Sequence, residues 1–585
     1  MKYLTLEIVG GAFCFIFSIS LAMADTCYVD LNSRKPTPPY ESWKTASTDI
    51  QSAIEAAGSG DTILLADGVY AVGSPIKVGK PLNIQSLNGR DFTTVTAHRN
   101  SRVFMLNAYT GPIELKGLTI SGGYIDKKGG VGGGVVVHGD GPIKITDCRI
   151  EDNEAIKHGG GIHFCLQPGT AIDATISRCL IQNNQAGSHG GGIHAPMWDG
   201  VTGSIRIEDC VVNNNQAGGE GGGVRCTSTN GLVMLERCLV SYNTAERGGG
   251  VLLGRNTRIA NSLIYRNTAL SADGGGIRAG GSGGGHDSGD GGDNCGGGHD
   301  DGGDHDDGGD HDDGGDHDDG GGHDGGSGHD GGGKGRGGAG SGGLIVNCTI
   351  TENHAATAGG GVINPYVYNS IVYGNSAVSD QEIGSGSEVS NTCASTLVQG
   401  INGNINMPPQ FISAASGDFR LLATSPCIDA GANNRVAQPV DLGWHSRITD
   451  GDFDDTPIVD MGAYEFQGML LQIEIIPNDE MNAVALESFG RMKVAIVSDG
   501  TLDLCNLDPA SVRFCKAAPV RMSRKDVNRD GVDDWMFHFN ISHLALPAEN
   551  HNAYLFGQTV DGRLVMGEAA ISINSKKQKP NRNTH

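Results

Sequence analysis

The chain has 585 residues, of which 94 are glycine, and a formal net charge of −25. Residues 280–343 hold 16 Asp against one Lys and one Arg, so the rest of the chain is only moderately acidic. This charge excludes nucleic acid as a partner, because phosphates need a basic surface.

Residues 1–24 predict a secretory signal peptide. Lys2 precedes an apolar run from Ile8 to Ala22, and the small-residue site Ala22-Met23-Ala24 comes just before Asp25. An uncleaved membrane anchor is the alternative, but the run is short for a span and no later segment could cross a bilayer. We expect an exported protein whose mature chain begins near Asp25.

Near the N-terminus, the sequence predicts a short helix followed by a strand and a turn. Ile50, Ala53, Ile54 and Ala57 fall on one face of a short helix. Residues 60–70 (GDTILLADGVY) are expected to form the first strand and turn. The helix would cap the open end of a solenoid, which would otherwise expose an unpaired edge.

A seven-residue motif then recurs along the chain. In each copy a Cys or Ser is followed five residues later by Asn, and in six copies a Gly triplet and then Ile or Val come next. The copies are DCRIEDN (147–153), RCLIQNN (178–184), DCVVNNN (209–215), RCLVSYN (237–243), NSLIYRN (261–267), NCTITEN (347–353) and NSIVYGN (369–375). The period falls from 31 to 22 residues, which is the length of one solenoid turn.

Each recurring feature of the motif has a role in such a turn. Cys and the aliphatic residues would point inward and stack about 4.8 Å apart. Asn would bond to the Asn of the next turn, and glycines would supply bends with positive φ. We therefore predict an all-β, right-handed parallel β-helix over residues 25–466. Its cysteines are expected to be core thiols, with disulfides or a metal as alternatives.

The repeat NCTITEN followed by GGGV resembles that of chlamydial polymorphic outer membrane proteins and of other pectate-lyase-like β-helices. SPCIDAG (425–431), DLGWHSR (441–447) and VDMGAYEF (459–466) are similar to the closing segment of choice-of-anchor Q proteins. The resemblance implies a bacterial β-helix, secreted or on the cell surface, and says little about activity. Beyond that pattern, this chain carries a further domain and a basic tail at 575–585.

Residues 472–574 alternate in hydrophobicity and predict a small β-sandwich. Cys505 and Cys515 are the best disulfide candidates. Residues 526–534 (DVNRDGVDD) match the first part of a calcium loop. Hard oxygen ligands would come from the side chains of Asp526, Asn528, Asp530 and Asp534 and from the carbonyl of Val532. A plain acidic turn is the alternative.

A candidate ligand-binding flank follows the Gly triplets. The first residue after each triplet should point inward and the second outward, which places His163, His194, Arg225 and Arg278 in one outward row. Loops of variable length follow, and one carries Trp198. We predict a shallow basic and aromatic track for an acidic glycan. Ordinary polar outward positions are the alternative.

The composition of residues 280–343, with its repeated DHDDGG, predicts a disordered insert in which His and Asp could at most collect metal weakly. Two functions remain open. One is non-catalytic binding of a polysaccharide or another cell surface, which we favour. The other is a polysaccharide lyase or glycoside hydrolase on the same fold, which would need a carboxylate-bound cation with a base, or paired carboxylates.

Overall fold

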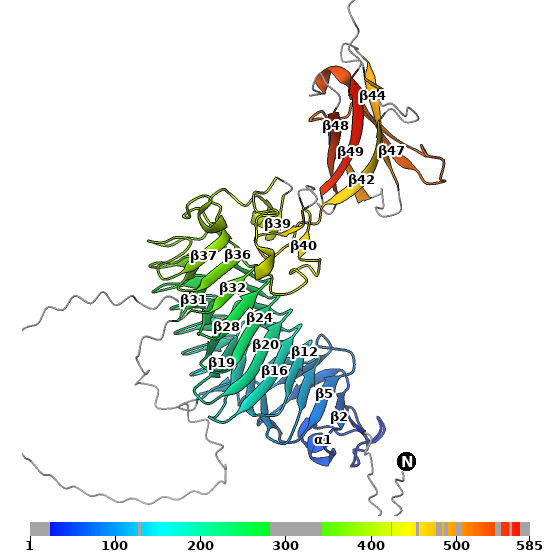
Figure 1. Cartoon of the computed structure of the whole chain (residues 1–585). Helices are drawn as coiled ribbons and strands as arrows, with labels where there is room; N and C mark the ends of the chain where they lie inside the picture. Colours follow the sequence, from blue (N-terminus) through cyan, green and yellow to red (C-terminus); the bar gives the residue numbers. More distant parts are fainter. Residues whose placement is uncertain are drawn as a thin grey trace, which may run out of the picture.

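The computed structural model describes residues 24–126, 130–280, 342–422, 424–451, 456–475, 483–484, 490–498, 506–544, 551–560 and 564–573. Residues 1–23, residues 281–341 of the insert, Cys505 and the tail 575–585 lie outside this set, so the predictions made for them are not addressed. A long β-helix and a separate C-terminal sheet make up the molecule (Figure 1). No helix among the described residues is long and apolar enough to cross a membrane.

The N-terminal end is closed by a strand and a short helix. Helix α1 (Ile50–Ala56) buries Ile50, Ala53 and Ile54, as its sequence pattern predicts. Asp49 caps it, because its carboxylate accepts the Ser52 N–H at 2.7 Å. Residues 60–70 do contain the expected strand, β2 (Thr62–Leu65), but it is not the first, since β1 (Thr26–Val29) precedes it and pairs with it in parallel.

Three parallel sheets form the solenoid, and each turn between residues 113 and 363 adds strands to all three. The long sheet contains β1, β2, β3 (Gly68–Ala71), β5 (Leu82–Ser86), β6 (Thr93–Thr96), β8 (Ile113–Lys116), β9 (Thr119–Ser121), β12 (Ile143–Thr146), β13 (Arg149–Glu151), β16 (Ala171–Ser177), β17 (Leu180–Gln182), β20 (Thr202–Glu208), β21 (Val211–Asn213), β24 (Leu232–Glu236), β25 (Leu239–Ser241), β28 (Thr257–Ala260), β29 (Leu263–Tyr265), β32 (Leu344–Val346), β33 (Thr349–Thr351), β36 (Tyr366–Tyr373) and β37 (Glu388–Cys393).

The other two sheets are shorter. The nine-stranded sheet contains β4 (Ile76–Val78), β7 (Phe104–Ala108), β11 (Val135–Gly139), β15 (Ile162–Phe164), β19 (Ile193–Met197), β23 (Val224–Ser228), β27 (Val251–Leu253), β31 (Ile277–Ala279) and β35 (Val362–Ile363). The seven-stranded sheet contains β10 (Tyr124–Ile125), β14 (Glu154–Ala155), β18 (Gln185–Ala186), β22 (Gln216–Ala217), β26 (Thr244–Ala245), β30 (Thr268–Ala269) and β34 (His354–Ala355).

Strands of successive turns stack in register, so the Cys or Ser residues of the motif form the predicted row along the solenoid, here called the cysteine ladder. The Asn residues of the motif form a second row, here called the asparagine ladder. The thiol of Cys210 accepts the backbone N–H of Cys179 at 3.4 Å, and Ser262 takes the same place beneath Cys238 at 3.0 Å. All five ladder cysteines are buried free thiols. Cys165, which lies outside the ladder, is disulfide-bonded.

The predicted asparagine ladder is also confirmed. The amide of Asn184 donates to the side-chain oxygen of Asn215, and Asn215 donates to Asn243, both at 3.0 Å. The second amide hydrogen of each goes to a main-chain carbonyl. At the C-terminal end Asn375 donates to the carboxylate of Glu382 at 2.9 Å, which ends the row. Every ladder amide thus keeps its hydrogen bonds although it is buried.

Glycine supplies fewer of the bends than the sequence predicts. The first glycine of each triplet does have positive φ, as Gly190 does at 63°. Two further left-handed positions in each turn carry mostly other residues, at the positions just before the ladder Cys or Ser and just before the ladder Asn. The third glycine has a different role. A Cβ on Gly161, Gly192, Gly223, Gly250 or Gly276 would lie 2.6–2.8 Å from a carbonyl oxygen of the next turn.

Residues 405–466, here called the closing segment, pack along the side of the last turns. Their elements are β38 (Phe411–Ser413), η2 (Ala414–Ser416), β39 (Asp418–Leu421), η3 (Asn433–Arg435), β40 (Ile448–Thr449) and β41 (Ile458–Val459), and η1 (Ile401–Gly403) precedes them. Asn261, Asn347 and Asn369, each just before a ladder Cys or Ser, donate to the carbonyls of Val440, Asp460 and Ala432. In the earlier turns, that position holds ion pairs instead, such as Asp209 with Arg237 at 2.7 Å.

The C-terminal unit is one eight-stranded, mostly antiparallel sheet around a shared core of Phe514, Phe537 and Phe539. Its elements are β42 (Met469–Ile475), β43 (Ala483–Val484), β44 (Arg491–Val497), β45 (Leu507–Phe514), β46 (Arg521–Lys525), β47 (Asp534–Asn540), η5 (Ile541–His543), β48 (His551–Thr559) and β49 (Leu564–Ile573). Cys515 is a free thiol, so the disulfide expected there is wrong.

Candidate functional site

The predicted flank is largely closed to solvent. His163, His194 and Arg225 are buried and Arg278 is half-buried, so the expectation that this row faces water is wrong for the first three. The cause is the bend at the Gly triplet, which folds the residue before the triplet back over the outward strand position. Arg225 accordingly pairs with Glu220, five residues earlier, at 3.2 Å.

Arg278 repeats this arrangement, since its Nε lies 2.7 Å from the carboxylate of Asp273, again five residues earlier. In the two histidine turns the residues before the triplets are also histidines. The rings of His158 and His189 stack with centroids 4.9 Å apart, and those of His163 and His194 lie 5.0 Å apart. The row therefore forms a second buried layer outside the solenoid core.

The hydrogen bonds of His194 fix its protonation. Arg225 Nη1 lies 2.8 Å from His194 Nε2, and because guanidinium only donates, Nε2 must accept. The ring proton is then on Nδ1, which donates to Nδ1 of His163 at 3.0 Å. Burial and the charge of Arg225 lower the pKa of His194 well below its ordinary value. His194 is neutral, and the pH-dependent positive charge expected of this row is not available from it.

The loop flank, meaning the loops that follow strands of the nine-stranded sheet, does present aromatic rings. Trp198 directly follows β19 and is 44% exposed. Tyr109 directly follows β7 in the same way and is 63% exposed. The two strands are three places apart in the sheet, which corresponds to about 14 Å at about 4.8 Å per strand. The sequence predicts Trp198 but misses Tyr109, whose loop precedes the first copy of the motif.

The predicted calcium loop forms a compact turn before β47. Asp526 accepts the N–H groups of Arg529 at 2.6 Å and Gly531 at 3.0 Å, and Gly531 has φ of 91°. Asp534 is buried and accepts the N–H of Val527 at 2.7 Å. Hydrogen bonds from the backbone N–H of Val532 and the side chain of Asn528 lower the pKa of Asp530.

These carboxylate and amide oxygens suit calcium. In the part of the chain that the structure describes, no three His, Cys, Asp or Glu side chains are gathered closely enough to hold a metal ion. Calcium at Asp526, Asn528, Asp530, the Val532 carbonyl and Asp534 therefore stays a prediction.

If calcium binds, it should stabilise the C-terminal sheet by about 2–3 kcal/mol at a free concentration about 100 times its dissociation constant. Calorimetry of the whole protein should show one transition that rises with calcium and falls with chelator. Asp526→Ala should abolish this response, and Asp508→Asn, in the same sheet but outside the loop, should keep it. A melting temperature that does not change in saturating calcium would contradict the predicted calcium site.

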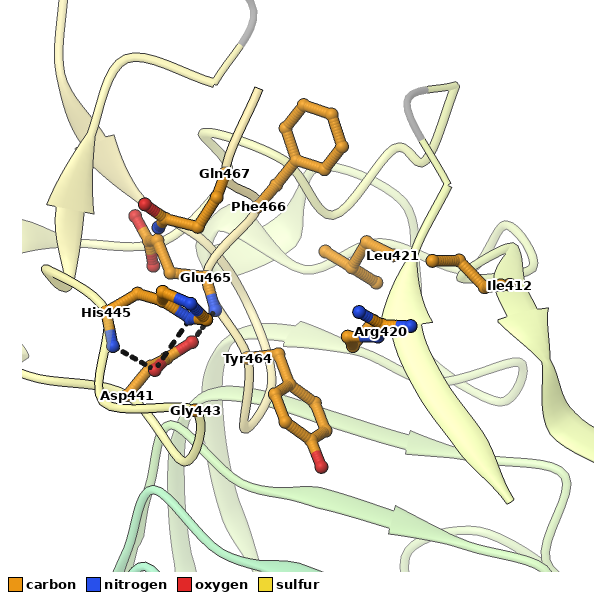
Figure 2. Close-up of a pocket in the computed structure, with 10 residues that line it drawn as sticks. All are labelled: Ile412, Arg420, Leu421, Asp441, Gly443, His445, Tyr464, Glu465, Phe466 and Gln467. Carbon is orange, nitrogen blue, oxygen red and sulfur yellow. Dashed lines mark hydrogen bonds and ion pairs between the residues drawn. The ribbon is translucent and has the colours of Figure 1, made fainter. Parts of the chain in front are cut away.

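A pocket of about 340 Å³ lies within the closing segment (Figure 2). Its polar lining comes from Arg420, Asp441, His445, Tyr464 and Gln467. Ile412, Leu421 and Phe466 supply apolar surface, and Gly443 and Glu465 complete the lining. The pocket brings together β39 and two stretches of chain that are remote from it in sequence.

Asp441 organises one side of this pocket. Its carboxylate accepts the backbone N–H of His445 and that of Glu465, both at 2.8 Å, and its Oδ1 lies 3.5 Å from Nδ1 of the half-exposed His445. Figure 2 shows the imidazole over this carboxylate. Arg420 is held by two hydrogen bonds to Asp418 at 2.7 and 2.9 Å. Burial, with Asp418 and Asp441 nearby, raises the pKa of Tyr464 to about 12.

Beneath the pocket is a buried charge cluster. Arg447 is fully buried and its Nη1 lies 3.3 Å from Glu465 Oε2, while Nη2 donates to the carbonyl of Gly462. Asp460 accepts the backbone N–H of Asp429 at 2.8 Å. Burial raises the pKa of Asp460 and of Glu465, since both carboxyl groups are shielded from water. Because Glu465 belongs to this cluster, the cluster fixes the stretch of chain between β41 and β42 that carries Tyr464 and Phe466.

The sequence identifies the closing segment by its motifs but not as a site. Asp441, His445, Tyr464 and Glu465 all lie inside DLGWHSR and VDMGAYEF, so the signal was present. Their convergence with Arg420 could not be read from spacing, because it depends on how β39 packs against the loops.

A comparison with known protein families agrees with this repeat. The model of the Chlamydia polymorphic membrane protein repeat matches residues 178–196, which include one ladder Cys, one ladder Asn and one Gly triplet. No curated protein matches the chain. The right-handed β-helix thus carries a repeat like that of the polymorphic membrane proteins.

Several solved structures are similar at low identity. Pectate lyase Pel9A is 14% identical with a TM-score of 0.42, covering 76% of this chain and 97% of that one. The Dettilon tailspike protein gp208 is 10% identical with a TM-score of 0.33, covering 89% and 90%. The PL6 family alginate lyase AlyGC is 12% identical with a TM-score of 0.26, covering 74% and 60%.

Proposed function

We propose that the chain is an exported β-helix protein, secreted or on the cell surface, that binds polysaccharide along its loop flank without cleaving it. The observation that carries the proposal is the pair of exposed rings, Trp198 and Tyr109, on loops at equivalent places of the same sheet. Flat aromatic faces that leave one side open to water bury large areas on contact with a partner at little entropic cost. A polymer laid along the solenoid axis would meet both rings.

The groups around this flank support binding over catalysis. Arg225 and Arg278, which a lyase could use as bases, are engaged by Glu220 and Asp273. The buried His194 is neutral and turned toward His163. These side chains already have partners that define the fold, so the exposed rings are the better candidates for contact with a ligand.

Trp198→Ala should weaken binding to an immobilised polysaccharide by about tenfold, the effect expected for truncating a central aromatic contact. Affinity electrophoresis against a panel of neutral and uronate polymers would measure it. Phe92→Ala is the matched control, because Phe92 is also an exposed ring but lies between β5 and β6 of the long sheet. Equal losses in both variants, or none in Trp198→Ala, would contradict the proposal.

A further inference from the structure

The pocket of the closing segment is separate from the loop flank and has its own chemistry. Its volume of about 340 Å³ is at the lower end of the range of ligand pockets, which suits a small ring and not a polymer strand. Apolar carbon from Ile412, Leu421 and Phe466 contributes to its wall. Hydrogen-bonding groups of His445, Asp441 and Gln467 contribute polar surface, so the lining is amphipathic.

The charge of the pocket is set by Asp441. This carboxylate is fully buried and accepts the backbone N–H groups of His445 and Glu465. The cation on the opposite wall, Arg420, is already paired with Asp418. Burial raises the pKa of Tyr464, and the nearby Asp418 and Asp441 raise it further. A second carboxylate entering here would be repelled.

We infer that this pocket binds a neutral sugar residue, such as the end or a side branch of a glycan. Sugar hydroxyls can exchange hydrogen bonds with the half-exposed His445 and with Gln467, while the buried Asp441 carboxylate lies beneath the imidazole of His445. The carbon face of the ring can pack against Phe466 and Leu421. The assignment deepens the proposed function and rests on it for the ligand class, but it concerns a different surface from Trp198.

The inference is tested with short oligosaccharides, which are too small to need the loop flank. Isothermal titration of the whole protein should show binding of at least one neutral oligosaccharide, and at least about tenfold weaker binding of the matched uronate, because like charges repel. His445→Ala should weaken binding of the neutral oligosaccharide by about tenfold. His543→Ala, in η5 of the C-terminal unit, should leave binding of the neutral ligand unchanged.

A charge variant keeps the test independent of folding. Gln467 lies at the half-exposed rim, and Gln467→Lys would add a cation beside Asp441. This variant should bind the uronate more tightly than the wild type does. Preference of the wild type for the uronate, or no effect of either pocket substitution, would overturn the inference.

The two proposals fail differently. If short neutral oligosaccharides do not bind at all but polymers still bind in a Trp198-dependent way, the pocket assignment is wrong and the proposed function stands. If short ligands bind through His445 but polymer binding does not change in Trp198→Ala, the assignment of polysaccharide binding to the loop flank is wrong. Loss of both kinds of binding would overturn both.

Discussion

Gly192→Ala should destabilise the β-helix by about 3 kcal/mol or more, as expected when an atom is forced into a closely packed backbone. The new Cβ would lie 2.6 Å from the carbonyl oxygen of Gly223 and 3.1 Å from the side-chain nitrogen of Asn215. Neither neighbour can yield alone, because Gly223 belongs to the next turn and Asn215 to the buried ladder. Thermal or denaturant unfolding of the full chain measures the loss.

Gly79→Ala is the matched control for this substitution. An added Cβ there meets nothing within 4 Å and the backbone is not in a left-handed region. Its stability should stay within about 0.5 kcal/mol of the wild type. Similar unfolding of both variants would show that the turns are not stacked as closely as described.

Arg447→Met should cost the closing segment about 3–5 kcal/mol, the range found when one partner of a buried ion pair is removed. Glu465, Asp460 and Asp441 would then share a buried site without their cation. This loss of stability should become smaller as pH falls, because protonated carboxyl groups are neutral and do not need a cation beside them. The pKa values, raised to about 9 for Glu465 and to about 7 for Asp460, make that rescue begin near pH 9 and continue through neutral pH.

Arg435→Met is the control, since Arg435 lies in the same segment but is exposed, with its guanidinium 4.3 Å from the ring of Tyr368. Its effect should stay below about 1 kcal/mol and should not depend on pH in this way. Unfolding followed from pH 4 to pH 9 compares the two. A pH-independent loss in Arg447→Met would mean that the cluster acts by packing alone.

The core of the fold could be predicted from sequence because its signals are local and repeated. A residue type at a fixed offset must stack on its equivalent in the next turn, so Cys179 predicts the place of Cys210 and Asn184 that of Asn215. The change from Asp or Arg to Asn just before the ladder residue, first seen at Asn261, also marks where the closing segment packs. That meaning becomes clear only once Val440 is known to lie beside it.

The site was harder to predict. The alternation of residues along a strand shows which side chains point outward, but it does not show whether those side chains are exposed to solvent. His163 and His194 do point away from the solenoid core, yet the chain before each Gly triplet folds back and covers them. The pocket differs from the histidine row, because Arg420 and His445 come from segments that share no repeated motif. Contacts between such segments follow from packing and cannot be read from periodicity.

The central claim, an exported protein that holds polysaccharide without cutting it, is tested most directly by one incubation. The mature protein is mixed with a panel of polysaccharides in calcium buffer, and bound polymer, polymer length, reducing ends and unsaturated uronide absorbance are followed together. We predict that at least one polymer is retained by the protein with its length and reducing ends unchanged. Shortened polymer with new reducing ends or unsaturated uronides would contradict the account, as would no retention of any polymer.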